Sequence, residues 1–216
     1  MRLAGRAGKP LSRRSGGGTE SCMTTTHLLY LHGFRSSPQS AKARQMAAHV
    51  ARHHPAVTFW CPQLPPSPRA AMERVSEGID RWPRGAMAVI GSSLGGFYAS
   101  WVAQQAQAPS VLLNPAVHPA RDLERYIGEQ TAWHDPAERF YFLPEYIAEL
   151  RALKTQDLPP AAPEMAIIAK GDEVLDWREM AARYPQARLL LQEGGEHALA
   201  NFPEYLPAIT EFLKLA

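Results

Sequence analysis

The chain of 216 residues has few cysteines, little net charge and no long apolar run. Its two cysteines, Cys22 and Cys61, are too few for a disulfide scaffold, which fits a reducing compartment, and we expect a cytoplasmic protein. No stretch approaches the ~18 apolar residues that a membrane-spanning helix needs. The formal net charge of +2 is small, and we expect no nucleic-acid partner.

The first 22 residues differ in composition from the rest. They hold five basic residues against one glutamate, so the remainder carries a net charge of −2. Range 1–22 is rich in glycine and poor in large apolar side chains, and we expect a flexible basic extension outside the fold. It lacks the apolar segment of a secretory signal. Met23, just before the first predicted strand, favours an upstream start codon or cloning residues over an arginine-rich targeting peptide.

Strand-like and helix-like segments alternate through the rest of the chain. Strands are predicted at 26–31, 57–61, 86–91, 110–113, 165–169 and 188–192. Helices are predicted at 39–54, 68–81, 95–107, 144–154, 176–184 and 203–214. This alternation predicts an α/β fold: a single domain over 23–216 with a mostly parallel sheet of about six strands and helices on both faces. Ser37 before Pro38, and Ser67 before Pro68, are typical of helix N-caps.

A G-x-S-x-G motif carries the candidate nucleophile. Gly91, Ser93 and Gly95 supply its fixed positions. A short apolar segment precedes the motif and a helix-like segment follows it, which indicates a nucleophile elbow that exposes the Ser93 hydroxyl. The two glycines leave room for the tight turn, and Ser92 is interpreted as structural.

Two later loops supply an acid and a base. They follow the elbow in the chain order that a serine nucleophile of this kind requires, which is serine, then acid, then histidine. Asp172 and His197 each follow a predicted strand, and in open α/β sheets the carboxyl ends of the strands build the site. His197 alone among the histidines lies after the last strand in a Gly-Gly turn. Glu173 and Asp176 are alternatives for the acid. Asp172 is preferred because it lies nearest the strand end, whereas Asp176 suits an N-cap of the next helix.

The first predicted strand runs into His32-Gly33-Phe34, a turn that can donate backbone N–H groups. The N–H groups of Phe34 and Leu94 are the predicted oxyanion hole. Gly33 lets the backbone approach the substrate closely. We expect the His32 ring to support the turn by hydrogen bonding.

Other polar residues have open or minor roles. His49 and His53 lie four apart on a predicted helix, a spacing that can bind metal, but no acidic partner lies near and we interpret them as a solvated face. We therefore expect no metal and no cofactor. His118 lines the site or lies on the surface. Arg35 and the two serines after it contact a polar or phosphate-bearing leaving group, or else form a helix cap and a solvated arginine.

About fifty residues, 114–163, separate two predicted strands, which is long for a connection. Large apolar side chains in it are Trp133, Phe140, Tyr141, Phe142, Tyr146 and Ile147. They form either a small lid over Ser93 or ordinary packing of one or two extra helices, and packing is favoured for most of them.

Four strings together resemble one known family: YLHGFRSSP at 30–38, GSSLGG at 91–96, LNPA at 113–116 and GGEH at 194–197. They are similar to the small bacterial YqiA-like esterases of the α/β-hydrolase superfamily, from about Thr26 to the C-terminus. The resemblance implies a compact α/β-hydrolase fold without a large cap domain, active on acyl esters and acyl-CoA thioesters. It does not imply a physiological substrate.

The predicted reaction is hydrolysis of a small-molecule acyl ester or thioester through an acyl-enzyme, by Ser93, His197 and Asp172. We expect a monomer or a weak homo-oligomer. The same residues would also serve C–C or lactone hydrolysis, or acyl transfer to another acceptor. A ligand-binding, receptor-like protein with slow turnover is the alternative from another class. A plain interaction scaffold would leave the ordered site elements unexplained.

Overall fold

The computed structural model describes residues 24–133, 135, 137–153 and 159–216. The basic extension expected over 1–22, with Cys22, lies outside the described residues. Cys61 is half-buried and is a free thiol. None of the described helices is long and apolar enough to cross a membrane.

Six parallel strands form the main sheet, in the order β2-β1-β3-β4-β7-β8. The strands are β1 (His27–Leu31), β2 (Thr58–Trp60), β3 (Met87–Ser92), β4 (Ser110–Leu113), β7 (Glu164–Ala169) and β8 (Arg188–Gln192). Every predicted strand is present, and its ends agree with the prediction to within one residue. Because the sheet is covered on both faces, its central strands β3 and β4 are buried along their whole length and mostly apolar, with no exposed polar face.

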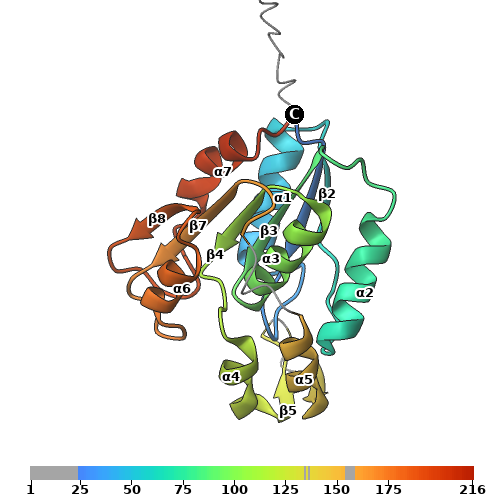
Figure 1. Cartoon of the computed structure of the whole chain (residues 1–216), viewed down its shortest axis with the longest axis vertical. Coiled ribbons are helices and arrows are strands. Elements are labelled where there is room, and N and C mark those ends of the chain that lie inside the picture. The colour runs from blue at the N-terminus through green and yellow to red at the C-terminus, as the bar shows by residue number, and fades with distance from the viewer. Residues whose placement is uncertain (1–23, 134, 136, 154–158) are drawn as a thin grey trace, which may run out of the picture.

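Helices cover both faces of this sheet (Figure 1). The helices α1 (Ala41–His53) and α7 (Leu206–Phe212) pack on one face, and α2 (Pro68–Ile79), α3 (Leu94–Ala106) and α6 (Trp177–Arg183) pack on the other. A 3-10 turn, Phe202–Tyr205, precedes α7. Alternate strand residues enter the two cores: Leu28 packs with α1 and α7, and Leu29 with α2 and α3.

The two predicted N-caps have different outcomes. Ser67 caps α2 as predicted, since its hydroxyl accepts a hydrogen bond from the Ala70 N–H at 3.1 Å. The prediction for Ser37 is wrong: α1 begins after Ser40. The Ser37 hydroxyl accepts the Gln39 N–H at 3.1 Å in a separate turn, a local bond that competes with helix formation.

The long connection between β4 and β7 has its own structure. Its elements are α4 (Pro119–Leu123), a 3-10 turn (Glu124–Tyr126), β5 (Gly128–Thr131), β6 (Arg139–Phe142) and α5 (Glu145–Ala152). The strands β5 and β6 pair antiparallel. Figure 1 shows α4, β5 and α5 grouped at one end of the main sheet. We call residues 114–163 the insertion. It is a small addition and not a large cap domain, as expected.

The aromatic side chains of the insertion divide into two groups. Phe142 and Ile147 are 1% and 4% exposed, so packing explains them. Trp133 and Tyr141 are 72% and 57% exposed, and packing does not explain them. The insertion therefore both completes a core and presents aromatic surface.

We predict that the centre of the sheet dominates stability. Leu112 on β4 is completely buried, so Leu112→Ala removes apolar contacts and leaves a cavity, and we expect the free energy of unfolding to fall by about 2–5 kcal/mol. The matched control is Leu191→Ala on β8, where the leucine is 42% exposed, with an expected loss below about 1 kcal/mol. Urea unfolding followed by tryptophan fluorescence measures both. Equal losses would contradict the burial described here.

Candidate active site

Ser93 lies in the turn between β3 and α3 with a backbone that side chains rarely adopt. Its φ is 56° and its ψ is −121°. Four hydrogen bonds hold this backbone: the Ser93 N–H donates to the Leu113 carbonyl at 2.9 Å, and the Ser93 carbonyl accepts from Gly96, Phe97 and Ala116 at 2.8, 3.4 and 3.0 Å. Strained backbone of this kind persists only where the surroundings fix it, and it clusters at functional sites.

The motif glycines have a steric reason in this turn. A Cβ atom on Gly91 would lie 2.0 Å from the Gly95 carbonyl oxygen, and one on Gly95 would lie 2.1 Å from the Leu31 carbonyl oxygen. Real Cβ contacts are much longer, and both opposing atoms belong to the backbone. Strand β1, strand β3 and helix α3 can therefore approach this closely only with glycine at both positions.

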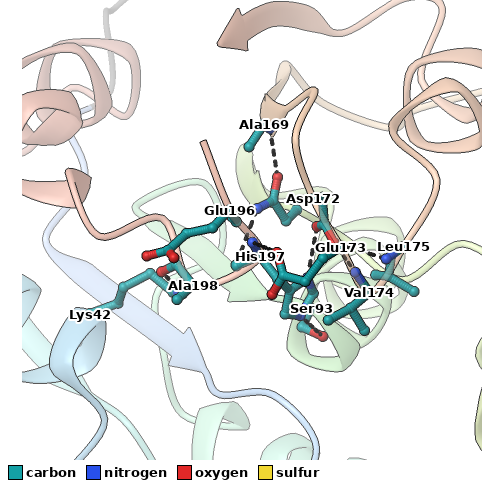
Figure 2. A network of polar contacts seen from close by, with 11 residues as sticks. Lys42, Ser93, Ala169, Asp172, Glu173, Val174, Leu175, Glu196, His197 and Ala198 are labelled. Carbon is teal, nitrogen blue, oxygen red and sulfur yellow. Dashed lines mark hydrogen bonds and ion pairs between the residues drawn. The ribbon is translucent and has the colours of Figure 1, made fainter. Parts of the chain in front are cut away.

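His197 and Asp172 complete a hydrogen-bonded chain with Ser93 (Figure 2). The Nε2 atom of His197 lies 3.0 Å from the Ser93 Oγ, and its Nδ1 lies 2.7 Å from the Asp172 Oδ2. The Asp172 side chain is fully buried, and its other oxygen accepts the N–H groups of Val174 and Leu175 at 2.8 Å each. A carboxylate at Nδ1 favours a proton there, which leaves Nε2 free to accept the Ser93 proton.

The two alternative acids lie elsewhere. Glu173 accepts a hydrogen bond from the His197 backbone N–H at 3.0 Å and does not contact the ring in this arrangement. Asp176 is the N-cap of α6 and accepts the Arg178 N–H at 2.9 Å. Of the three acidic residues, Asp172 is the one hydrogen-bonded to the imidazole of His197.

Asn114 connects three strand ends beneath the candidate triad. It is fully buried at the end of β4, and its amide donates to the carbonyls of Glu196 and His197 at 3.1 Å each. Its side-chain oxygen accepts the Ala169 N–H at the end of β7 at 2.8 Å. Sequence reasoning gave Asn114 no role. The sequence singled out Asn114 only as part of the LNPA string at 113–116, one of the four strings that carry the family resemblance.

Lys42 on α1 holds the next carbonyl along the same loop. Its ammonium donates to the Ala198 carbonyl at 2.5 Å (Figure 2). Burial lowers the pKa of Lys42 to about 8, although the charges of Asp172 and Glu196 act in the opposite direction. The side chains of Lys42, Asn114 and Glu173 come from three different parts of the fold. Together they hold the backbone from Glu196 to Ala198.

His32 orients the turn predicted to form the oxyanion hole. Its Nε2 accepts the Leu64 N–H at 3.1 Å, so its Nδ1 carries the proton and donates to the Gly33 carbonyl at 3.0 Å. The Ser36 N–H also donates to this carbonyl, at 3.3 Å. In a trans peptide the N–H points away from the preceding carbonyl, so the Phe34 N–H is turned to the opposite side.

Two backbone N–H groups are available near Ser93. No turn, loop or cap hydrogen bond among the described residues uses the N–H of Phe34 or Leu94. A Cβ atom on Gly33 would lie 3.2 Å from the Ser93 Cβ, so the turn passes directly beside the serine. The arrangement has the donors and the close approach that an oxyanion hole needs.

A cavity of about 150 Å³, which we call the cleft, opens at Ser93 and His197. Its apolar walls include Leu94, Leu175 and two aromatic residues of the insertion, Tyr126 and Trp133. Trp133, which packing did not explain, therefore lines the candidate site.

The insertion also braces the turn at Phe34. The Arg35 Nε donates to the Thr131 carbonyl at 2.6 Å, the Trp133 N–H donates to the Arg35 carbonyl at 2.7 Å, and the guanidinium lies 4.2 Å from the centre of the Trp133 ring. The Phe34 ring lies 5.2 Å from that of Phe142. The Arg35 backbone itself has φ 59°. Arg35 lines the cleft as well, so it is not the solvated arginine of the second alternative, and its contact with a leaving group stays a prediction.

Among the described residues, no histidine other than His197 lines the cleft. His118 is exposed and precedes α4, at a surface position. The rings of His49 and His53 lie 4.7 Å apart on α1. Among the described residues, no group of three or more histidine, cysteine or acidic side chains is arranged to hold a metal ion.

The sequence over residues 27–214 matches one family, the Uncharacterised protein family UPF0227. The chain belongs to this family. The match covers both the elbow and the His197 loop, and it confirms the resemblance to YqiA-like proteins found in the sequence. Membership itself names no substrate.

Solved structures share the fold at low sequence identity. Est1E from Butyrivibrio proteoclasticus, solved with ferulic acid, is 13% identical over 90% of each chain, with a TM-score of 0.70. Alpha/beta hydrolase domain-containing protein 10 from mouse is 16% identical over 88% of this chain and 90% of its own (TM-score 0.68). One of the two metagenome-derived lipolytic enzymes LipS and LipT is 18% identical over 89% of this chain and 95% of its own (TM-score 0.67). These likenesses establish the α/β-hydrolase fold.

We predict that Asn114→Asp loosens the His197 loop. Aspartate keeps an acceptor for the Ala169 N–H but, when ionised, cannot donate to the two carbonyls and repels them. We expect the free energy of unfolding to fall by about 1–3 kcal/mol. Amide hydrogen exchange should become faster in segment 193–199 before it does so elsewhere. Hydrogen exchange with mass spectrometry measures it. Asn201→Asp, at a half-buried asparagine whose amide donates to the Glu204 side chain, is the matched control, and equal exchange in both variants would refute the prediction.

Lys42 should give stability a specific dependence on pH. Its pKa is about 8 in the folded chain and 10.5 at its ordinary value, so between these pH values unfolding takes up a proton. This group therefore makes the free energy of unfolding rise with pH across that window. Lys42→Met removes the rise, so the Tm of the variant relative to wild type should fall between pH 8 and 10.5.

The control for Lys42 is Arg44→Met, at an exposed position on the same helix. Its Tm relative to wild type should stay constant over the same pH range. Parallel melting curves for wild type and Lys42→Met would show that the Lys42 pKa is not lowered.

Proposed function

We propose that the protein is a serine hydrolase that cleaves carboxylic acyl esters through an acyl-enzyme on Ser93. The observation that carries the proposal is the chain from the Ser93 Oγ through His197 to the buried carboxylate of Asp172, with contacts of 3.0 and 2.7 Å. It is supported by the strained backbone of Ser93 and by esterases and lipolytic enzymes among the proteins that share the fold.

In the first half of the reaction, His197 Nε2 accepts the proton of Ser93 while the Oγ attacks the acyl carbon. The carbonyl oxygen takes up the electron pair as the tetrahedral intermediate forms. Asp172 keeps the imidazole in the correct tautomer and stabilises the imidazolium. His197 then gives the proton to the leaving oxygen or sulfur as its bond to the acyl carbon breaks, which leaves an ester on Ser93.

In the second half, water replaces the alcohol or thiol. His197 accepts a proton from the water, whose oxygen attacks the acyl carbon of the ester. The bond to the Ser93 Oγ then breaks, and His197 returns the proton to that oxygen. The products are the free acid and the original enzyme, and the proposal assigns no step to a metal or cofactor.

The N–H groups of Phe34 and Leu94 would stabilise the developing oxyanion. Loss of one such donor typically costs about 10²–10³ in rate. His32 would contribute indirectly, because its bond to the Gly33 carbonyl sets the direction of the Phe34 N–H. His32 is therefore a positioning residue in this mechanism.

Related reactions use the same residues. Thioesters, including those of coenzyme A, fit the mechanism because the leaving atom needs only a proton from His197. C–C or lactone hydrolysis remains an alternative, since fold and triad do not select among them. A receptor-like protein would bind a ligand saturably without releasing product. Cytoplasmic location and a monomeric or weakly associated state stay predictions.

The test is hydrolysis of p-nitrophenyl acetate, butyrate, octanoate and palmitate by wild type, Ser93→Ala and Ser92→Ala. We expect Ser93→Ala to lose at least about 10⁴-fold in kcat, because no other group in the chain replaces the nucleophile. Ser92 is the adjacent serine on β3 and its variant should keep most of the activity. Equal residual rates in folded Ser93→Ala and wild type would sink the proposal and favour the receptor-like alternative.

A further inference from the structure

A second cavity adjoins the cleft. Its volume is about 220 Å³, and it shares Phe34, Arg35 and Leu94 with the cleft. Neither Ser93 nor His197 lines it. Its walls beyond the shared residues are mainly apolar and come from four parts of the chain: the turn after β1, the segment after β2, helix α3 and the insertion.

Tyr98 of α3 is one of the residues that line the second cavity, and it is 3% exposed. Burial raises the pKa of its phenol, so the hydroxyl stays neutral and adds no charge to the wall.

The proposed chemistry separates the two arms of the substrate. When the acyl carbon bonds to the Ser93 Oγ, its oxygen lies toward the N–H groups of Phe34 and Leu94. The leaving group must lie at His197 Nε2, which protonates it. The acyl substituent must therefore extend away from His197. Phe34 and Leu94 line both cavities, but His197 lines the cleft and not the second cavity.

We infer that the second cavity binds the acyl part of the substrate and that the cleft binds the alcohol or thiol part. This inference rests on the proposed function. The apolar walls, among them Leu64, Pro65 and Phe140, fit an apolar acyl group. The small volume limits that group to a compact chain or ring. The substrates are therefore esters of compact apolar carboxylic acids.

One residue in each cavity allows the two arms to be tested separately. Ala132 lines the second cavity and not the cleft, and it is 6% exposed. Val174 lines the cleft and not the second cavity, and it is 44% exposed. Ala132→Leu reduces the volume of the second cavity, and Val174→Phe narrows the cleft.

The experiment measures two ratios of kcat/KM for wild type and both variants. The acyl ratio compares p-nitrophenyl hexanoate with p-nitrophenyl acetate. The alcohol ratio compares hexyl acetate with ethyl acetate, and the release of acetic acid measures these two reactions. Ala132→Leu should lower the acyl ratio by at least about 10-fold and leave the alcohol ratio within about two-fold. Val174→Phe should have the reverse effect, and Arg44→Met, remote from both cavities, should change neither ratio.

Three results decide the matter. The inference is overturned if Ala132→Leu changes the alcohol ratio instead of the acyl ratio, or if it folds and changes neither. If Ala132→Leu does not fold, Gln63→Trp replaces it, because Gln63 is exposed and lines the second cavity. Activity that survives in Ser93→Ala refutes the proposed function, whereas activity lost there with unchanged ratios refutes the acyl subsite alone.

Discussion

The site depends on the backbone of one residue. Ser93 holds φ 56° where β3 becomes α3, and four backbone hydrogen bonds with the end of β4, the segment after β4 and the start of α3 keep it there. The close approach of α3 to β1 and β3 leaves no space for a Cβ atom at Gly91 or Gly95. The parallel sheet supplies this geometry, because the carboxyl ends of adjacent strands bring the turn, the acid loop and the histidine loop together.

The histidine loop is fixed by different means. Its Gly194-Gly195 turn has φ 69° and 77°, which lets the chain reverse after β8. Beyond the turn, the loop has no strand to pair with, and side chains from β4, α1 and the acid loop bind its backbone instead. Asn114 matters most among them, since one buried side chain links the ends of β4 and β7 with the segment that carries His197.

Much of the main sheet and of the candidate site could be predicted from the sequence, and the features that could not be predicted have physical reasons. Strong local signals, such as the apolar segments and the G-x-S-x-G turn, predicted all six strands of the main sheet. They also singled out Ser93, Asp172 and His197, which the structure places in hydrogen-bonding contact. The strands β5 and β6 are short and half-exposed and have no such pattern. Asn114 and Lys42 act on backbone groups far along the chain, at separations of 82 and 156 residues, so local sequence does not indicate these partners, although Asn114 lies in one of the strings of the family resemblance.

The insertion contributes both to the packed core and to the walls of the two cavities. Its hairpin also holds the turn at Phe34 through the bond from Arg35 to the Thr131 carbonyl. The most direct measurement for the central claim is mass spectrometry after reaction with a fluorophosphonate, which labels activated serines. A single adduct on the peptide with Ser93, formed much more slowly in His197→Ala, is the predicted result. No adduct, or an adduct on another serine at an equal rate, would contradict the claim that His197 activates Ser93.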